Sequence, residues 1–292
     1  MPTKTDKLVN QLVHDNQITL SNPFLDPDQR TSFVSRCSKT IIQCKFNLML
    51  VQVDEFEIVI RRHQLLFITL KEKLTKLALT NEVKILPFNI NALDPAGLNS
   101  FIRQFITVTN EMHCVRLLLH SIARGNLKPL VSLGDGSDEY SEELSVEDIK
   151  LTTYAMSTSI LDWSKAILKA GLFEEDARII GLTSEGAHKY WEGYAAVSIA
   201  KCALESLCTY MAVELSKHGL KTNLIQAGIT GTPSLKRIKE SEKLLQMAKE
   251  RNPMGRITVP ADVANVIYLL CTNEASWING SIIHVDGGEH CR

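Results

Sequence analysis

The sequence predicts an α/β fold in which helices flank a parallel β-sheet, and two observations lead to this expectation. Apolar runs of strand length alternate with helical stretches from Thr40 onward, which is the pattern of a parallel sheet. The chain has 292 residues, of which 45% are hydrophobic, so it can bury one large core. We therefore expect one main domain at 39–292, preceded by a polar, proline-punctuated extension at 1–38.

The order of elements follows from this alternation. Six apolar segments are expected as strands: Phe56–Ile60, Val83–Pro87, Val115–His120, Arg178–Thr183, Lys221–Gln226 and Ser281–Val285. The expected helices are Gln64–Leu79, Pro95–Thr109, Val146–Lys169, Tyr194–His218, Glu240–Arg251 and Pro260–Thr272. Asp94 before Pro95 is a typical helix start, and Gly219 suits the left-handed position that closes a helix.

Composition narrows the range of partners and compartments. The 32 basic and 33 acidic residues balance and form no basic stripe, which argues against nucleic acid as a partner and favours small molecules. The seven cysteines have no paired spacing, so we expect neither a disulfide framework nor a zinc or other metal site. Charges interrupt the apolar runs at the N-terminus, and no stretch approaches 18 apolar residues, so we expect a cytoplasmic protein without a membrane span.

Tyr194 and Lys201 form the most informative pair of reactive side chains. They are seven residues apart in an expected helix, so they project from the same face, about 10.5 Å apart along the axis. A nearby ammonium would lower the pKa of the phenol and make it a better proton donor or acceptor near neutral pH. By itself the spacing is weak evidence, because such a pair is also common in a purely structural helix.

The surrounding segment, 181–215, resembles the active-site region of short-chain dehydrogenases/reductases. The spacing of tyrosine, six residues and lysine resembles the enoyl-acyl-carrier-protein reductase branch, since most other members place the lysine four residues after the tyrosine. The resemblance covers about 83–292 and ends on the VDGG turn at 285–288. It implies a Rossmann-like doubly wound parallel sheet, NADH or NADPH as cofactor, and a homodimer or homotetramer.

The same resemblance assigns a cofactor site. His120, Ser121 and Ile122 match the HSI motif beside the nicotinamide ribose, and Lys201 would hold the ribose hydroxyls. The remaining cofactor positions that it implies are Ala227, Gly228 and Thr232 at the carboxamide or phosphate, and Asn89 at the adenine.

The catalytic residues implied are Tyr194, Lys201 and Ser184, acting on an acyl thioester carried by acyl carrier protein. Tyr194 would donate a hydrogen bond to the enolate oxygen that develops when hydride reaches the β-carbon. Ser184 stands where many enoyl reductases have a second tyrosine. Ketone-reducing relatives have a serine thirteen residues before the tyrosine, and this position is Gly181, which favours enoyl over carbonyl reduction.

The first 96 residues contain no glycine, whereas a dinucleotide fold normally has glycines after its first strand, where backbone N–H groups approach the pyrophosphate. Two alternatives therefore stay open beside enoyl reduction: a 3-oxoacyl reductase or other short-chain oxidoreductase, and a non-catalytic paralogue with a degenerate cofactor site. The amphipathic stretch 234–254 resembles the substrate lid of the family, and its lysines could meet an acidic carrier protein.

Overall fold

A computed structural model describes residues 48–51, 88, 90–110, 112–131, 143–232, 235 and 241–292. These residues belong to one compact unit. The expected boundary between an extension at 1–38 and the main domain at 39–292 lies outside the described residues, as do the expected strands Phe56–Ile60 and Val83–Pro87 and the helix Gln64–Leu79.

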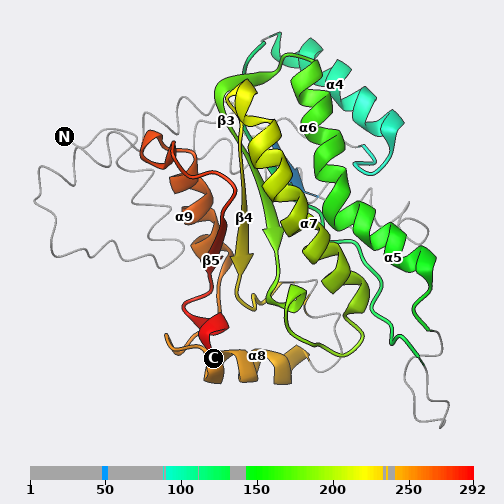
Figure 1. Cartoon of the computed structure of the whole chain (residues 1–292), viewed down its shortest axis with the longest axis vertical. Coiled ribbons are helices and arrows are strands. Elements are labelled where there is room, and N and C mark those ends of the chain that lie inside the picture. The colour runs from blue at the N-terminus through cyan, green and yellow to red at the C-terminus, as the bar shows by residue number, and fades with distance from the viewer. Residues whose placement is uncertain are drawn as a thin grey trace, which may run out of the picture. The chain divides into compact units, whose positions relative to one another are not determined.

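A parallel sheet forms the centre of the described part (Figure 1). Its strands are adjacent in chain order: β1 (Leu48–Val51), β2 (Val115–Ser121), β3 (Phe173–Thr183), β4 (Lys221–Ala227) and β5 (Ile282–Val285). All four neighbouring pairs run parallel. This confirms the expected fold class, and four of the expected strands are present within a few residues of their predicted bounds.

Two strands differ from the expectation. β1 was not predicted, although its residues Leu48–Val51 are an apolar run. β3 begins at Phe173 instead of Arg178, because a bulge carries its acidic segment past β2: Val115 pairs with Phe173, and Leu117 pairs with Arg178. A charged stretch is atypical of a buried strand, and the basic side chains that neutralise it are Arg178 on β3 itself, Arg116 on β2 and Lys221 on β4.

The helices are α4 (Pro95–Thr109), α5 (Val146–Thr153), α6 (Ser159–Lys169), α7 (Ala195–Glu214), α8 (Ser241–Arg251) and α9 (Pro260–Leu270). They confirm the five predicted helices that lie in the described residues, with Asp94 capping α4 and Gly219 in the left-handed conformation. The expected helix 146–169 is interrupted by a π-helical turn, η1 (Tyr154–Thr158), which separates α5 from α6.

The sheet is covered on both faces, as Figure 1 shows with α6 and α7 on one side and α9 on the other. Alternation along the strands explains the two layers. Leu118 and Leu224 belong to the core cluster with residues of α6 and α7, whereas Leu117 and Ile225 pack with residues of α9. Strands buried on both faces are nearly continuous apolar runs, which is why the sequence predicted them correctly.

A buried ion-pair network fixes the start of β3. Arg178 is 1% exposed and donates to the backbone carbonyl of Leu270 at 2.7 Å and to both carboxylate oxygens of Asp176. Lys221 on β4 also contacts that carboxylate. Burial raises the pKa of Asp176, but the hydrogen bonds from Arg178 and Lys221 outweigh it and lower the pKa to about 2.

One helix among the described residues, α7, is long and apolar enough to cross a membrane by length and composition alone. The helix contains Lys201 and Glu205, so it is not the uninterrupted run of 18 apolar residues that the sequence analysis looked for. The helix packs against β3 and β4, and its buried side chains, such as Leu204 and Met211, lie in the main core cluster. Burial in a folded domain thus explains the apolar face of α7 that contacts the sheet, whereas Ile199, Tyr210 and Val213 on the same helix are exposed.

Candidate functional site

The carboxyl ends of β2, β3 and β4 form one edge of the sheet, and the predicted site residues gather there. His120 pairs with Gly181, and Thr183 pairs with Gln226, so these strand ends are in register. In open α/β sheets this edge is where ligands bind. The chain continues from β3 through Ser184 and a short loop to Tyr194, the residue that precedes α7.

Ser184 and Tyr194 face each other across this loop. The Oγ atom of Ser184 lies 3.5 Å from the phenolic oxygen of Tyr194 and accepts a hydrogen bond from the backbone N–H of Gly186. A Cβ atom on Gly186 would lie 2.5 Å from Cε1 of Tyr194, so only glycine lets the ring approach the loop this closely. The structure therefore brings together two of the three predicted catalytic residues.

Tyr194 does not have the lowered pKa that its spacing from Lys201 suggested. Burial raises the pKa of the phenol, and the contact with Ser184 opposes this shift only in part. The expectation failed because the Lys201 ammonium donates to the backbone carbonyl of Leu182 at 2.7 Å instead of approaching the phenol. Tyr194 thus remains a neutral hydrogen-bond donor at physiological pH.

Lys201 is a buried cation with spare hydrogen-bonding capacity. Its side chain is 6% exposed, and burial lowers its pKa from 10.5 to about 8, an effect that Glu205 partly opposes. An ammonium carries three N–H donors, and within the described residues Lys201 makes the one hydrogen bond to Leu182. A buried donor without partners is costly, so the geometry fits a ligand that offers hydroxyl oxygens, such as a ribose.

His120 is buried near the end of β2 and fixes this strand end through a hydrogen bond. It is 2% exposed, and its Nε2 lies 2.7 Å from Oγ of Ser159. Because the Ser159 hydroxyl donates to the carbonyl of Ala155, it must accept from a protonated Nε2. Burial, followed by the charge of Lys201, lowers the His120 pKa to about 3, so the ring is neutral and ties β2 to the first residue of α6.

The other predicted cofactor residues occupy the same edge. Ser121 is half-buried, and Ile122 packs in a small cluster with Val197, Ala200 and Tyr194. Beyond β4, a Cβ atom on Gly228 would lie 2.5 Å from Oγ1 of Thr258 and 2.6 Å from Oε2 of Glu289, so this turn requires glycine. Its neighbours Ala227 and Thr232 are half-buried, and Asn89 lies outside the described residues.

Gly181 does not bear on the chemistry, contrary to the inference from the sequence. A Cβ atom there would lie 2.8 Å from Cδ2 of Leu224 and point toward Ile160 and Leu204, so a serine at this position would enter the hydrophobic core. The hydroxyl beside Tyr194 comes instead from Ser184. Counting residues back from the tyrosine selected the wrong position, because the loop between β3 and α7 sets which side chain faces the phenol.

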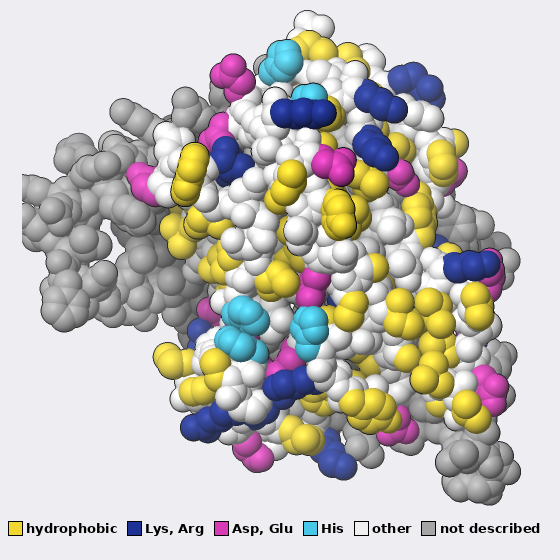
Figure 2. Space-filling model, viewed as in Figure 1, with side chains coloured by type: hydrophobic (Ala, Val, Ile, Leu, Met, Phe, Trp, Pro, Cys, Tyr) yellow, Lys and Arg dark blue, Asp and Glu magenta, His cyan; other side chains and the backbone are white. Residues whose placement is uncertain are grey.

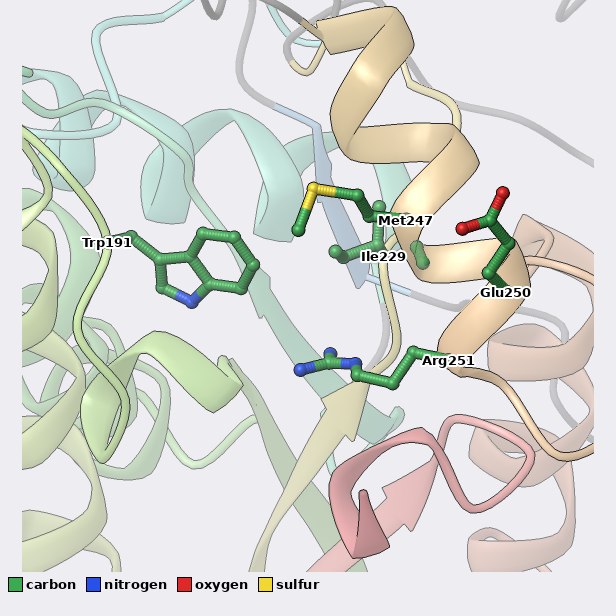
Figure 3. Close-up of a pocket in the computed structure, with 6 residues that line it drawn as sticks. Trp191, Ile229, Met247, Glu250 and Arg251 are labelled. Carbon is green, nitrogen blue, oxygen red and sulfur yellow. The ribbon is translucent and has the colours of Figure 1, made fainter.

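A pocket of about 350 Å³ lies beside this edge (Figure 3). It is lined by Trp191, Ile229, Met247, Ala248, Glu250 and Arg251. Figure 3 shows the Trp191 ring and Met247 of α8 facing the same space, with the Arg251 guanidinium extending into it and Glu250 directed away. Met247 was predicted on the apolar side of its helix, but Trp191 and Arg251 were missed, because their role depends on the packing of α8.

His284 in β5 and Asp286 and His290 in the turn after it lie together, and their possible ligand atoms are within 4.8 Å of one another. The Asp286 carboxylate accepts hydrogen bonds from the backbone N–H groups of Gly288 and His290 and from Nδ1 of His290, at 2.6 Å for the last. These bonds hold a turn in which Gly288 has a φ of 83°. The cluster is accounted for by the architecture of the turn.

Comparison with known proteins gives consistent results. The family described as enoyl-(acyl carrier protein) reductase matches residues 65–290. The NADH-dependent enoyl-acyl-carrier-protein reductase of Enterococcus faecalis is 28% identical over 222 residues, 76% of this chain and 82% of that protein. The corresponding enzyme of Buchnera aphidicola is 30% identical over 222 residues, 75% of this chain and 80% of that protein.

Two solved structures are similar in fold. The NADH enoyl-acyl-carrier-protein reductase of Aquifex aeolicus has a TM-score of 0.65 at 24% identity, covering 77% of this chain and 83% of that one. The enoyl-acyl-carrier-protein reductase of Bacillus cereus, solved with NADP+ and indole naphthyridinone, has a TM-score of 0.61 at 25% identity, with coverages of 72% and 76%.

Proposed function

The chain belongs to the enoyl-(acyl carrier protein) reductase family, and we propose that it uses NADH or NADPH to reduce the trans-2 double bond of an enoyl thioester in fatty-acid synthesis. The observation that carries the proposal is the convergence of Ser184, Tyr194 and Lys201 on one edge of the sheet. When bound, the nicotinamide supplies the hydride for the β-carbon of the substrate.

Tyr194 has the properties of a donor to the thioester oxygen. Hydride addition places negative charge on this oxygen, and a preorganised donor stabilises charge that appears in the transition state. Because burial raises its pKa, the phenol keeps its proton near neutral pH and donates a hydrogen bond instead of accepting one. Ser184, 3.5 Å away, orients the phenol and offers a second hydroxyl.

Lys201 is proposed to hold the ribose hydroxyls of the cofactor. Its bond to Leu182 fixes the ammonium at the end of β3, and its other N–H donors remain for the ligand. The carboxamide is assigned to the glycine turn at Gly228, with Thr232 beyond it. His120 has its Nε2 engaged by Ser159, so its proposed role is to hold the strand end in place rather than to donate from Nε2 to the cofactor.

A 3-oxoacyl reductase is the second candidate, and the pair formed by Ser184 and Tyr194 is the observation that favours it, because two hydroxyls can polarise a ketone. Purified protein assayed with crotonyl and acetoacetyl thioesters separates the two reactions. Reduction of crotonyl thioester with little activity on acetoacetyl thioester is expected. The reverse preference would defeat the enoyl assignment.

A non-catalytic paralogue is the candidate of another class, favoured by the absence of glycine in the first 96 residues. Calorimetric titration with NADH and NADPH decides between it and an enzyme. Saturable heat and a rise in the melting temperature are expected. Neither signal at millimolar cofactor would mean that the fold is retained without the activity.

Acyl carrier protein is the proposed substrate carrier. Lys249 and Lys243 are exposed on α8, which forms one wall of the pocket, and exposed cations suit an acidic partner. Lys249→Glu should raise KM for an enoyl group on acyl carrier protein and leave KM for the enoyl coenzyme A thioester within twofold. An equal rise for both carriers would argue against this contact.

The protein is further proposed to form a homodimer or homotetramer in the cytoplasm. Hydrophobic side chains gather over α5 and α7 on the face seen in Figure 2. Leu151 on α5 and Ile199, Tyr210 and Val213 on α7 are exposed, and an exposed apolar patch of this kind is typical of a subunit interface. Light scattering after size-exclusion chromatography should show a multimer that Ile199→Glu dissociates. A monomeric wild-type protein would contradict the proposal.

A further inference from the structure

Arg251, the last residue of α8, joins three segments that are distant in the sequence. Its Nη2 atom lies 2.5 Å from Oε2 of Glu185 and 2.6 Å from Oε1 of Glu289. Glu185 follows Ser184 directly, and Glu289 is 1% exposed in the turn after β5. The other carboxylate oxygen of Glu289 accepts from the backbone N–H of Ile229, in the loop after β4.

The charges in this cluster are balanced. Glu185 also pairs with Lys189 at 2.5 Å, so two carboxylates face two cations. Glu289 depends on Arg251 most strongly, because a buried carboxylate without a cation is costly and Arg251 is the cation bonded to it in the described part of the chain. Both contacts come from Nη2, whose two N–H groups can serve one carboxylate each.

The attachment of α8 is concentrated at its C-terminal end. Among the side chains of α8 that the structure describes, Ala248 alone is buried, and Met247 is 52% exposed. Directly after the helix, the buried Asn252 donates to the backbone carbonyl of Asp286 at 2.7 Å. Arg251 and Asn252 therefore hold one end of the helix, while the rest of α8 rests on few buried contacts.

We propose that Arg251 is a positioning residue that fastens α8 to the segment beside Ser184 and, through Glu289, to the loop carrying Ile229, and so sets the width of the pocket that receives the acyl group. Trp191 and Met247 face each other across this pocket, and the separation between their elements is fixed by the bridge. The assignment of the acyl group rests on the proposed function, whereas the effect of Arg251 on α8 does not.

The test uses Arg251→Met in the full chain, with Arg256→Met as the matched control. Arg256 pairs with the Asp262 carboxylate at 2.7 Å and 2.9 Å in an exposed position and does not line the pocket. Hydrogen exchange in 241–251 should be at least about tenfold faster in Arg251→Met and unchanged in Arg256→Met, because only the first change removes a charge-assisted attachment of α8.

Kinetics give the second readout. For Arg251→Met, KM for a long-chain enoyl thioester should rise about tenfold while kcat stays within about threefold, since the wall of the pocket is displaced and the donors at Tyr194 are not. Arg251→Lys should restore part of the affinity, because lysine keeps the positive charge on a side chain that is one bond shorter. A loss confined to kcat, or exchange in α8 equal to wild type, would overturn the proposal.

A milder variant keeps the test decisive if Arg251→Met does not fold. Glu185→Gln removes one carboxylate and leaves the pair of Arg251 with Glu289, so Glu289 retains its cation. Faster exchange in α8 is expected here also, by a smaller factor. Should the protein reduce no enoyl thioester at all, the exchange measurements still decide whether Arg251 holds α8, so failure of the proposed function and failure of this inference remain distinguishable.

Discussion

Replacing Lys201 by methionine should stabilise the protein while abolishing its activity. A pKa lowered from 10.5 to about 8 means that folding disfavours the charged ammonium by roughly 3 kcal/mol at pH 7. Methionine removes this cost but leaves the carbonyl of Leu182 without its donor, which offsets about 1–2 kcal/mol. The net gain of roughly 1–2 kcal/mol corresponds to a rise of about 2–8 °C in the melting temperature.

The pH dependence identifies the cause. Because the folded-state pKa of Lys201 lies below its unfolded value, the unfolded chain binds the extra proton between pH 8 and 10.5, and wild-type stability rises with pH across this window. The advantage of Lys201→Met should therefore be complete below pH 8 and reverse near pH 10.5, where the lost hydrogen bond remains. Thermal unfolding followed by circular dichroism at pH 7 and pH 10 measures this.

An exposed lysine on another helix provides the control. Lys165 is exposed on α6, and Lys165→Met should change stability by less than about 0.5 kcal/mol at either pH. The activity of Lys201→Met should fall by at least about a hundredfold in kcat/KM, because a ligand of the cofactor is removed. A variant that is less stable than wild type by the same amount at both pH values would refute the reasoning, because burial of the ammonium would then carry no cost.

Three further outcomes are expected. Gly228→Ala should cost about 1–3 kcal/mol and weaken NADH binding in calorimetric titration, because the added methyl overlaps Oγ1 of Thr258; unchanged affinity would contradict the tight turn. The lowered pKa of Asp176 gives stability that is present above its ordinary pKa of 3.8 and is lost as pH falls through about 2. Asp176→Asn should therefore lose less stability than the wild type between pH 5 and pH 2.5, which urea unfolding at these two pH values tests. Gly181→Ser should lower the melting temperature and create no acetoacetyl reductase activity, and a gain of that activity would restore the role that the sequence suggested for this position.

The sequence predicted those parts of the fold in which periodicity and capping agree. The helix Pro95–Thr109 was predicted to the residue, because Asp94 and Pro95 mark its start and its apolar face is regular. The start of β3 could not be predicted in the same way, because its acidic residues are neutralised by Arg116, Arg178 and Lys221, which come from three strands. Arg178 is local to this segment, but Arg116 and Lys221 reach it only once β2 and β4 pair with β3.

The site, like the fold, was predicted in part. Resemblance to a family placed Ser184, Tyr194 and Lys201 together, and the contact between Ser184 and Tyr194 agrees with it. The predicted direction of the Tyr194 pKa shift was wrong. A spacing of seven residues along a helix fixes the axial separation of two side chains, but it does not fix where the end of the long lysine side chain lies. The ammonium of Lys201 reaches the carbonyl of Leu182, a partner that exists only once β3 and α7 are packed.

The protonation states at the edge of the sheet fit together physically. Burial keeps the imidazole of His120 neutral and the phenol of Tyr194 protonated, and it opposes the charge on Lys201, so of these three side chains only Lys201 is charged at neutral pH. Such an arrangement costs stability, and it is useful only where negative charge or hydroxyl oxygens arrive. A neutral donor and one buried cation suit a reaction that develops an enolate oxygen beside a bound ribose. We therefore expect that hydrogen bonds from Lys201 to the bound cofactor offset the cost of burying its ammonium.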